Sequence, residues 1–323
     1  MKAIVATAPG GPEVFRVAER PIPEPKAGWV LIRVKAFGLN RSEMFTRQGH
    51  SPGVLFPRVL GIECVGVVEA APGGEVPVGQ TVAAVMGGMG RAYDGGYAEY
   101  TLVPASQVLP VQTSLPWEVL GAIPETFLTA WGSLFEALAV EPGQTLLVRG
   151  GSSALGLATT TLAKAHGLTV VLTTRSQDKR QRLLDHGADQ VLIDPGELAA
   201  AVRRQWPDGV DAVLELVGTV TLLDSLRLLR PRGTLCYSGI LGNAWALKEF
   251  EPFMIPSTVR LTTYTSETLN ARNATAALQS ILDGVDAGRY RVAIDRVFGL
   301  EELVEAHRYM ESNQAAGKLV VVT

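Results

Sequence analysis

Short apolar runs separated by proline and glycine dominate the first third of the chain. Residues 29–36, 63–70, 81–85 and 97–103 combine β-branched, aromatic and small apolar residues between polar flanks. Runs of this length, bounded by turn-forming residues, are typical of β-strands. We therefore predict that the chain up to about Pro116 forms an all-β unit.

The pattern changes after about Glu118, where helical periodicity alternates with compact apolar runs. This alternation predicts βαβ units around a parallel sheet. The predicted strands are 145–148, 169–173, 190–193, 212–215 and 234–237, and the predicted helices are 155–166, 178–186, 198–204 and 220–229. Beyond about Leu261 the alternation stops, and the apolar run 318–322 is predicted to be a strand that rejoins the sheet of the first unit.

The four histidines receive different predictions. His166 and His186 each precede a glycine, which is typical of a helix C-terminus where the imidazolium favours the dipole and glycine takes the left-handed conformation. His307 lies in a helical stretch, 301–311, and we expect it on the protein surface. His50 follows a glycine in a loop, and either a surface position or a role as proton donor is open to it.

Composition excludes several classes of function. The chain has 323 residues, a formal net charge of −3, 47% hydrophobic residues and two cysteines. At roughly 150 residues per domain, this length suggests two domains. Without a basic excess, binding to nucleic acid or to an anionic membrane is not expected, because phosphate binding depends on Lys and Arg. No apolar stretch reaches the roughly 20 residues of a spanning helix, and two cysteines cannot form a disulfide framework, so we expect a cytoplasmic protein.

The strongest chemical signal is a glycine-rich segment, residues 148–156, between a predicted strand and a predicted helix. Its small residues, Gly150, Gly151 and Gly156, would let the backbone approach a pyrophosphate, whose charge is held by amides at the helix N-terminus. The spacing is GxxSxxG rather than GxGxxG, and a tight turn without a ligand is the alternative. The flanking strand and helix favour a dinucleotide site.

The end of the second predicted strand indicates which dinucleotide binds. NAD enzymes place an Asp or Glu there for the ribose hydroxyls. Here the sequence reads Thr174-Arg175-Ser176, followed by Lys179. A guanidinium beside hydroxyl and ammonium groups suits a 2′-phosphate. The sequence thus favours NADPH over NADH, and a solvated basic helix start is the alternative.

Several short motifs in a fixed order give the chain a family resemblance. They are the Pro-rich stretch 21–25, Gly38-Leu39-Asn40, residues 60–63 (LGIE), residues 94–100 (DGGYAEY), the glycine-rich segment and Gly317-Lys318. With these motifs the chain resembles the zinc-independent branch of the medium-chain dehydrogenases/reductases, which includes the quinone oxidoreductases and zeta-crystallin. The resemblance implies an α/β fold with a GroES-like β domain (1–118 and 262–323) and a doubly wound parallel-sheet Rossmann domain (119–261).

Departures from the zinc alcohol dehydrogenases bear on the reaction. Those enzymes place a Cys where this chain has Asn40 and a His where it has Ile62, and they carry a four-cysteine lobe that is missing here. Neither replacement is a zinc ligand of that kind. Metal-assisted alcohol oxidation is therefore not expected, since no Lewis acid would stabilise an alkoxide.

The resemblance also implies the site residues. Asn40, Phe45 and Thr129 are expected at the nicotinamide and substrate, with Asn40 as donor to a developing oxyanion; a turn-capping Asn40 and a helix-interior Thr129 are the alternatives. Relatives carry tyrosines at the positions of Phe45 and Ser51, so the proton is left to water or His50. The implied cofactor residues are Gly151, Ser152, Ser153, Ala154, Leu155, Gly156, Thr174, Arg175, Ser176, Lys179, Ser238, Gly239, Ile240, Leu241, Leu261, Thr262, Thr263 and Lys318.

The leading hypothesis is an enzyme, a metal-free NADPH-dependent reductase that transfers hydride to a quinone or to the β-carbon of an α,β-unsaturated carbonyl. The alternatives are an enoyl-thioester reductase and a non-catalytic NADPH-binding sensor or structural protein. The resemblance further implies a homodimer through an edge strand at residues 260–264, where Thr262, Thr263 and Tyr264 have β propensity.

Overall fold

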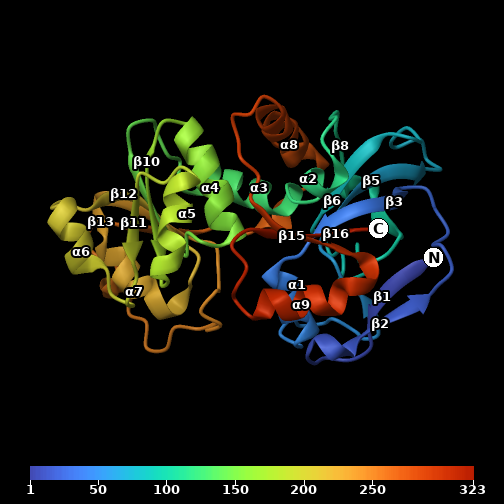
Figure 1. Ribbon diagram of the computed structural model, residues 1–323, viewed down its shortest axis with the longest axis horizontal. Coiled ribbons are helices and arrows are strands. Elements are labelled where there is room, and N and C mark those ends of the chain that lie inside the picture. The colour runs from blue at the N-terminus through green and yellow to red at the C-terminus, as the bar shows by residue number, and fades with distance from the viewer. The chain divides into compact units, whose positions relative to one another are not determined.

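The computed structural model describes residues 1–323 and consists of two compact units. Unit 1 comprises Met1–Leu128, Ser266–Gly288 and Val292–Thr323, and unit 2 comprises Thr129–Thr265 and Arg289–Arg291. The two ends of the chain therefore belong to the same unit, as the blue and red parts of the ribbon show (Figure 1). None of the helices combines the length and the apolar character that crossing a membrane requires.

Unit 2 is built on a six-stranded parallel sheet. Its order is β11-β10-β9-β12-β13-β14, and every neighbouring pair is parallel. The strands are β9 (Thr145–Arg149), β10 (Thr169–Thr174), β11 (Gln190–Ile193), β12 (Val210–Glu215), β13 (Leu229–Tyr237) and β14 (Arg260–Thr263). The order reverses at β9, as in doubly wound folds, which bind ligands at the carboxyl ends of the strands beside that point.

Helices cover both faces of this sheet, which explains why the middle of its central strands is buried and apolar, as in residues 146–148 of β9 and 212–214 of β12. The helices are α4 (Ala154–Ala165), α5 (Arg180–Asp185), α6 (Ala199–Gln205) and α7 (Thr219–Arg227). Helix α4 packs on β9 and β10, α7 packs on β12 and β13, and α6 packs on α7 (Figure 1). His166 and His186 are the C-caps of α4 and α5, followed by Gly167 at φ +89° and Gly187 at φ +119°, which confirms their predicted role.

Unit 1 contains two β-sheets. The larger has the order β15-β16-β3-β5-β6-β8, with β7 also paired to β3, and the smaller has the order β2-β1-β4. The strands are β1 (Lys2–Ala6), β2 (Phe15–Glu19), β3 (Trp29–Gly38), β4 (Arg58–Val59), β5 (Glu63–Ala70), β6 (Thr81–Val85), β7 (Tyr100–Pro104), β8 (Val108–Pro110), β15 (Ile294–Gly299) and β16 (Lys318–Val322). Strand β16 pairs antiparallel with β3, which confirms the predicted return of the chain end to the first sheet.

The main segment of unit 2, Thr129–Thr265, begins and ends later than the predicted Rossmann domain, 119–261. The first boundary falls after Leu128 rather than after residue 118, and the second falls after Thr265 rather than after residue 261. Helix α2 (Trp117–Leu120) packs on β3 and β16, and a Cβ atom at Gly121 would lie 2.8 Å from the Cβ atom of Ala36. This close packing keeps the segment after residue 118 in unit 1.

Unit 1 also contains helices. Helix α1 (Arg41–Arg47) lies within the predicted all-β segment and was missed, whereas α2, most of α3 (Pro124–Trp131), α8 (Ala271–Asp286) and α9 (Leu303–Glu311) lie beyond it. Helix α9 confirms the predicted helical stretch 301–311, and α8 was not predicted. Asn40 caps α1, and Glu43 lies three residues later, which is a recognised helix-start signal. In α8 the buried residues Ala274, Leu278 and Ile281 recur at helical spacing. Both helices were therefore readable from the sequence.

The predicted surface position of His307 is wrong. This side chain is 0% exposed in α9, its Nε2 lies 3.2 Å from the Tyr97 hydroxyl oxygen, and its ring centroid lies 4.8 Å from that of Phe15. Burial lowers the pKa of His307 to about 3. The histidine therefore belongs to the aromatic core of unit 1 as a neutral side chain.

Candidate functional site

The glycine-rich segment connects the end of β9 to the start of α4. Gly150 adopts φ +87°, and its backbone N–H donates to the Thr173 hydroxyl oxygen at 3.1 Å. The Gly151 N–H donates to the Thr173 carbonyl at 3.0 Å. These two bonds fix the segment against β10, at the carboxyl ends of the strands.

Backbone crowding explains why glycine occupies two further positions. A Cβ atom at Gly156 would lie 2.6 Å from the carbonyl oxygen of Gly151, and one at Gly151 would lie 2.7 Å from the Cβ atom of Leu172. Ser153 is the N-cap of α4, and its hydroxyl oxygen accepts from the Gly156 N–H at 3.1 Å. The first-turn amides of a helix have no intrahelical acceptor, so this N-terminus offers donors and a positive dipole end to an anion.

The predicted 2′-phosphate residues follow β10. Arg175 is exposed and makes no hydrogen bond or ion pair within the protein. Thr174 is buried, and its hydroxyl oxygen accepts from the Ser176 N–H at 3.2 Å, which fixes the turn that carries the arginine. Lys179 ends a 3-10 helix, Gln177–Lys179, just beyond. The guanidinium of Arg175 is therefore available to an anion.

A buried arginine network beside the loop was missed by the sequence analysis. Arg149, the last residue of β9, is 0% exposed. Its Nε and Nη2 donate to the Asp194 carboxylate at 2.8 and 3.0 Å, and its Nη1 donates to the Asp224 carboxylate at 2.7 Å. Further bonds go to the Ser225 hydroxyl and the Gly196 carbonyl. The guanidinium is fully engaged, so it ties the ends of β9 and β11 to α7 and is not available to a phosphate.

The segment after β13 approaches the glycine-rich loop. A Cβ atom at Gly150 would lie 3.0 Å from the Leu241 Cδ1 atom, and one at Gly239 would lie 2.4 Å from the Leu216 carbonyl oxygen. The Ser238 hydroxyl lies 3.0 Å from that of Ser133, in the π-helix Gly132–Ala137 that continues α3. The structure thus brings the predicted segment 238–241 to the loop.

Other predicted cofactor residues have different surroundings. Leu261 is partly buried and packs against the hydrophobic core of unit 2, and its role in lining the site stays a prediction. Thr262 and Thr263 continue the edge strand β14 in register with Cys236 and Tyr237. Thr129 is 8% exposed within α3, which is the helix-interior alternative.

In unit 1 the Asn40 side chain is held by charged partners. Its amide oxygen accepts from the Lys318 ammonium at 2.6 Å, and its amide nitrogen donates to Glu63 at 2.9 Å and to Glu43 at 3.3 Å. A flipped amide would face the ammonium with its nitrogen, so these partners determine its orientation. Both amide hydrogens face carboxylates, so Asn40 is the N-cap of α1 and part of a buried network, and its expected role as donor to an oxyanion stays a prediction.

Lys318 belongs to the same network. Its ammonium lies 2.9 Å from Glu63 in an ion pair whose side chains are 3% and 1% exposed. The second Glu63 oxygen accepts from the Glu125 N–H at 2.9 Å. The lysine is therefore buried between Glu63 and Asn40 within unit 1, and its expected cofactor contact stays a prediction.

Glu43 completes this buried network. It is 1% exposed and accepts from the N–H groups of Asn40 at 2.9 Å and Ile62 at 3.2 Å. Burial raises the pKa of Glu43 to about 7, the nearby Glu63 adds to the rise, and Lys318 opposes it. Asn40 and Ile62 stand at the two zinc-ligand positions of the alcohol dehydrogenases. In this protein both donate a backbone hydrogen bond to Glu43. Among all 323 residues, no group of three or more His, Cys, Asp or Glu side chains is placed to hold a metal ion.

Phe45 and His50 lie together beyond this network. Phe45 is 8% exposed in α1, and its ring centroid lies 6.4 Å from that of His50 in an edge-to-face arrangement. The His50 N–H donates to the Phe45 carbonyl at 2.9 Å. The Ser51 hydroxyl is 2.7 Å from that of Thr46. The exposed imidazole therefore lies next to the residue predicted to face the substrate.

Comparisons with known proteins agree with this architecture. Residues 26–113 match the alcohol dehydrogenase GroES-like domain, and residues 186–321 match a zinc-binding dehydrogenase domain. Human quinone oxidoreductase is 28% identical over 100% of this chain and 98% of its own length. A mycobacterial protein solved in complex with NADPH is 30% identical with a TM-score of 0.90, and each chain covers 100% of the other.

A third similar protein is a structure of 2-haloacrylate reductase, which is 26% identical with a TM-score of 0.86 over 100% of this chain and 99% of that one. Full-length similarity at this level extends through both units. The chain belongs to the zinc-independent, quinone oxidoreductase branch of the medium-chain dehydrogenase/reductase family of oxidoreductases.

Proposed function

We propose that the protein is an NADPH-dependent, metal-free reductase of quinones or α,β-unsaturated carbonyls. One observation carries the proposal: the glycine-rich loop lies where the strand order reverses, and the unpaired Arg175 follows the neighbouring strand β10. Relatives named quinone oxidoreductase and a similar structure that contains NADPH support the same conclusion.

The residues of unit 2 fit NADPH in three respects. Gly151 and Gly156 leave backbone room that a Cβ atom would fill, which suits close approach of a pyrophosphate. The α4 N-terminus beside Ser153 supplies amide donors. Arg175, with Ser176 and Lys179 nearby, would hold the 2′-phosphate. When bound, NADPH supplies the hydride.

In unit 1 the network around Asn40 shapes the substrate wall. Asn40 and Glu43 fix the start of α1, and α1 carries Phe45. The surface of unit 1 that accepts substrate would therefore be apolar at Phe45 and supported by the buried charged groups around Asn40. His50, exposed beside Phe45, would deliver a proton to the reduced substrate, with water as the other source.

Reduction of a carbon–carbon double bond is the second candidate reaction. The similarity to 2-haloacrylate reductase favours it, because a haloacrylate is an α,β-unsaturated carboxylate. A quinone and an enone share the same requirement, hydride transfer to an electron-poor carbon conjugated to a carbonyl. Both substrates therefore suit one site, and the better acceptor defines the reaction.

The proposal extends to assembly and compartment. Strand β14 is the edge of the unit 2 sheet, and its unpaired side would join the same strand of a second copy to form a homodimer. Cys64 and Cys236 are both free thiols, which suits a reducing cytoplasm. Light scattering over a range of concentrations tests the dimer.

Cofactor oxidation by chelator-treated protein tests the proposed function. NADPH and NADH would each be offered with 9,10-phenanthrenequinone and with a 2-alkenal. We expect turnover with NADPH that survives chelation and is weaker with NADH. NADPH binding without turnover on any acceptor would instead support a thioester reductase or a sensor.

A further inference from the structure

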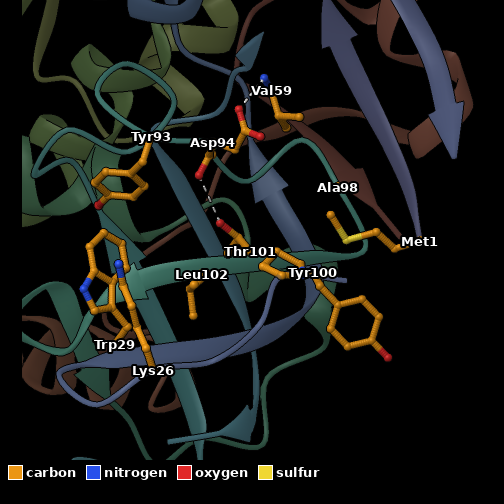
Figure 2. Close-up of a pocket in the computed structure, with 12 residues that line it drawn as sticks. Met1, Lys26, Trp29, Val59, Tyr93, Asp94, Ala98, Tyr100, Thr101 and Leu102 are labelled. Atoms are coloured by element: carbon orange, nitrogen blue, oxygen red, sulfur yellow. Dashed lines mark hydrogen bonds between the residues drawn. The ribbon is translucent and has the colours of Figure 1, made fainter. Parts of the chain in front are cut away.

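Unit 1 contains a cavity that no step of the proposed reaction uses. It has a volume of about 270 Å³ and is enclosed by the start of β3, by β7, by the loop before it and by the N-terminal residue (Figure 2). The lining residues are Met1, Pro23, Lys26, Trp29, Val59, Tyr93, Asp94, Gly95, Ala98, Tyr100, Thr101 and Leu102. Trp29 and Gly38 are nine residues apart along β3, which places this cavity about 30 Å from the Asn40 end of the strand at roughly 3.3 Å per residue.

One end of the cavity is an aromatic corner. The ring centroids of Trp29 and Tyr93 are 5.4 Å apart at an interplanar angle of 80°. The Lys26 ammonium lies 4.4 Å from the Trp29 ring centroid. Figure 2 shows the Tyr93 ring directed toward Trp29 and the end of Lys26. A flat ring entering this corner would meet aromatic surface on two sides.

Two polar groups in this corner lack protein partners. The Tyr93 hydroxyl oxygen is buried without a hydrogen-bond partner, although buried hydroxyls are usually bonded. Burial raises the pKa of Tyr93, so the phenol stays protonated and can donate. The Lys26 ammonium is exposed and makes no ion pair or hydrogen bond with the protein. Both groups offer hydrogen to an acceptor.

The negative charge that lines the cavity is already neutralised. One Asp94 oxygen accepts from the Arg58 guanidinium at 3.2 Å and from the Val59 N–H at 3.1 Å. The other lies 3.8 Å from the guanidinium of Arg20. The charge left over in the cavity is therefore the positive charge of Lys26. A cationic ligand is disfavoured, because the Lys26 ammonium, 4.4 Å from the Trp29 ring centroid, would repel it.

We propose that this cavity is a second ligand site, which binds a small aromatic carboxylate with its ring against Trp29 and its carboxylate between Lys26 and the Tyr93 hydroxyl. Leu102, Val59 and Ala98 add apolar surface that suits the ring. The volume lies just below the roughly 300 Å³ at which drug-sized sites begin, so a single-ring acid fits better than a dinucleotide. The site does not depend on the proposed reductase activity.

Ligand-observed NMR with the full-length protein tests the proposal without any turnover. The probes are benzoate, its neutral counterpart benzamide and the cation phenyltrimethylammonium, each titrated with and without saturating NADPH. For a ligand of this size we expect a benzoate Kd of about 1 mM. Benzamide and the cation should bind at least about fivefold more weakly, since each lacks the contact with Lys26.

Variants assign the binding to this cavity. Lys26→Met keeps the apolar stem and removes the charge, and should weaken benzoate about fivefold while leaving benzamide unchanged. Trp29→Leu should weaken both probes. Lys248→Met, at an exposed lysine of unit 2, is the matched control and should change neither. The proposal is overturned by absence of saturable benzoate binding, by equal affinity for benzamide, by insensitivity to Lys26→Met, or by displacement of benzoate with NADPH.

Discussion

The two units differ in how they use their polar groups. In unit 2 the exposed guanidinium of Arg175 makes no bond within the protein, and the α4 N-terminus presents amides without intrahelical acceptors. In unit 1 Asn40, Lys318 and Glu63 bond to one another. Groups without protein partners are available to a ligand, whereas mutually satisfied buried groups fix a shape. Unit 2 therefore presents polar groups that can bind a cofactor, whereas the network of unit 1 fixes the shape of that unit.

The buried networks of the two units also differ in charge. Arg149 in unit 2 lies between Asp194 and Asp224. Each nitrogen of its guanidinium donates to a protein acceptor. In unit 1 one ammonium, Lys318, faces Glu63 directly, and Glu43 adds a second carboxyl group whose pKa is raised to about 7. A buried charge left without its partner is costly. The network of unit 1 should therefore be the more sensitive of the two to loss of one charge and to pH.

The largest expected effect is that of Lys318→Met on stability. Removing the ammonium leaves Glu63 buried without its cation, which should cost about 3–5 kcal/mol in the free energy of unfolding. Urea denaturation measures this loss. Lys35→Met, at a half-buried lysine of β3, is the control and should change little. An unchanged stability with weakened NADPH binding would support the cofactor role expected from the sequence.

A double variant separates charge from packing. Glu63→Gln removes the carboxylate that Lys318 neutralises, so Lys318→Met combined with Glu63→Gln should recover part of the lost stability. Simple addition of the two single losses would mean that the pair is not coupled and would contradict the network.

Gly156→Ala should have the next largest effect, on cofactor affinity. The added Cβ atom would lie 2.6 Å from the Gly151 carbonyl oxygen, so the loop must shift. Displacement of a pyrophosphate site by even one ångström should weaken NADPH binding by about 100-fold. Fluorescence titration with NADPH measures this loss of affinity. Gly299→Ala, whose Cβ atom would meet only Glu302 at 3.4 Å, is the control, and equal affinity in the two variants would remove the loop from the site.

Arg175→Gln should have a smaller and selective effect. Loss of one charge-assisted contact to the 2′-phosphate should weaken NADPH about 10-fold and leave NADH unchanged. Parallel titrations with the two cofactors measure the ratio. Arg232→Gln, at an exposed arginine of β13 in the same unit, provides the matched loss of charge. Equal weakening of both cofactors would show that Arg175 contacts a part that they share.

The accuracy of the sequence predictions follows from the range of each interaction. The glycine-rich loop and the C-caps at His166 and His186 depend on residues within one turn, so local spacing was sufficient. The Asn40–Lys318 contact joins residues 278 positions apart through the pairing of β16 with β3, which no local pattern encodes. For that reason the sequence analysis named both residues as part of the site without predicting that they contact each other.

Arg149 and His307 also depend on contacts with residues far away in the sequence. The position of Arg149 next to the glycine-rich loop suggested nothing unusual, because Asp194 and Asp224 come from other elements. His307 was expected on the protein surface, whereas it packs against Phe15 and Tyr97, which come from other elements. Helix α8 is a different case, since its apolar spacing was present in the sequence and was not used.

The last expected effect concerns pH, and it is spread over more than one pH unit. The folded-state pKa of Glu43, about 7, lies above its ordinary value, so folding favours the protonated carboxyl. Its contribution to stability is complete at acidic pH and is lost as pH rises toward 7, with a slope of up to about 1.4 kcal/mol per pH unit. The low pKa of His307 acts in the opposite direction, because acid protonates the imidazole of the unfolded chain first.

Glu43→Gln isolates the effect of Glu43, since the His307 contribution cancels when the two proteins are compared. Urea denaturation across this range should therefore show the stability of the variant gaining on that of the original protein as pH rises, and parallel curves would mean that Glu43 does not hold a proton in the folded state.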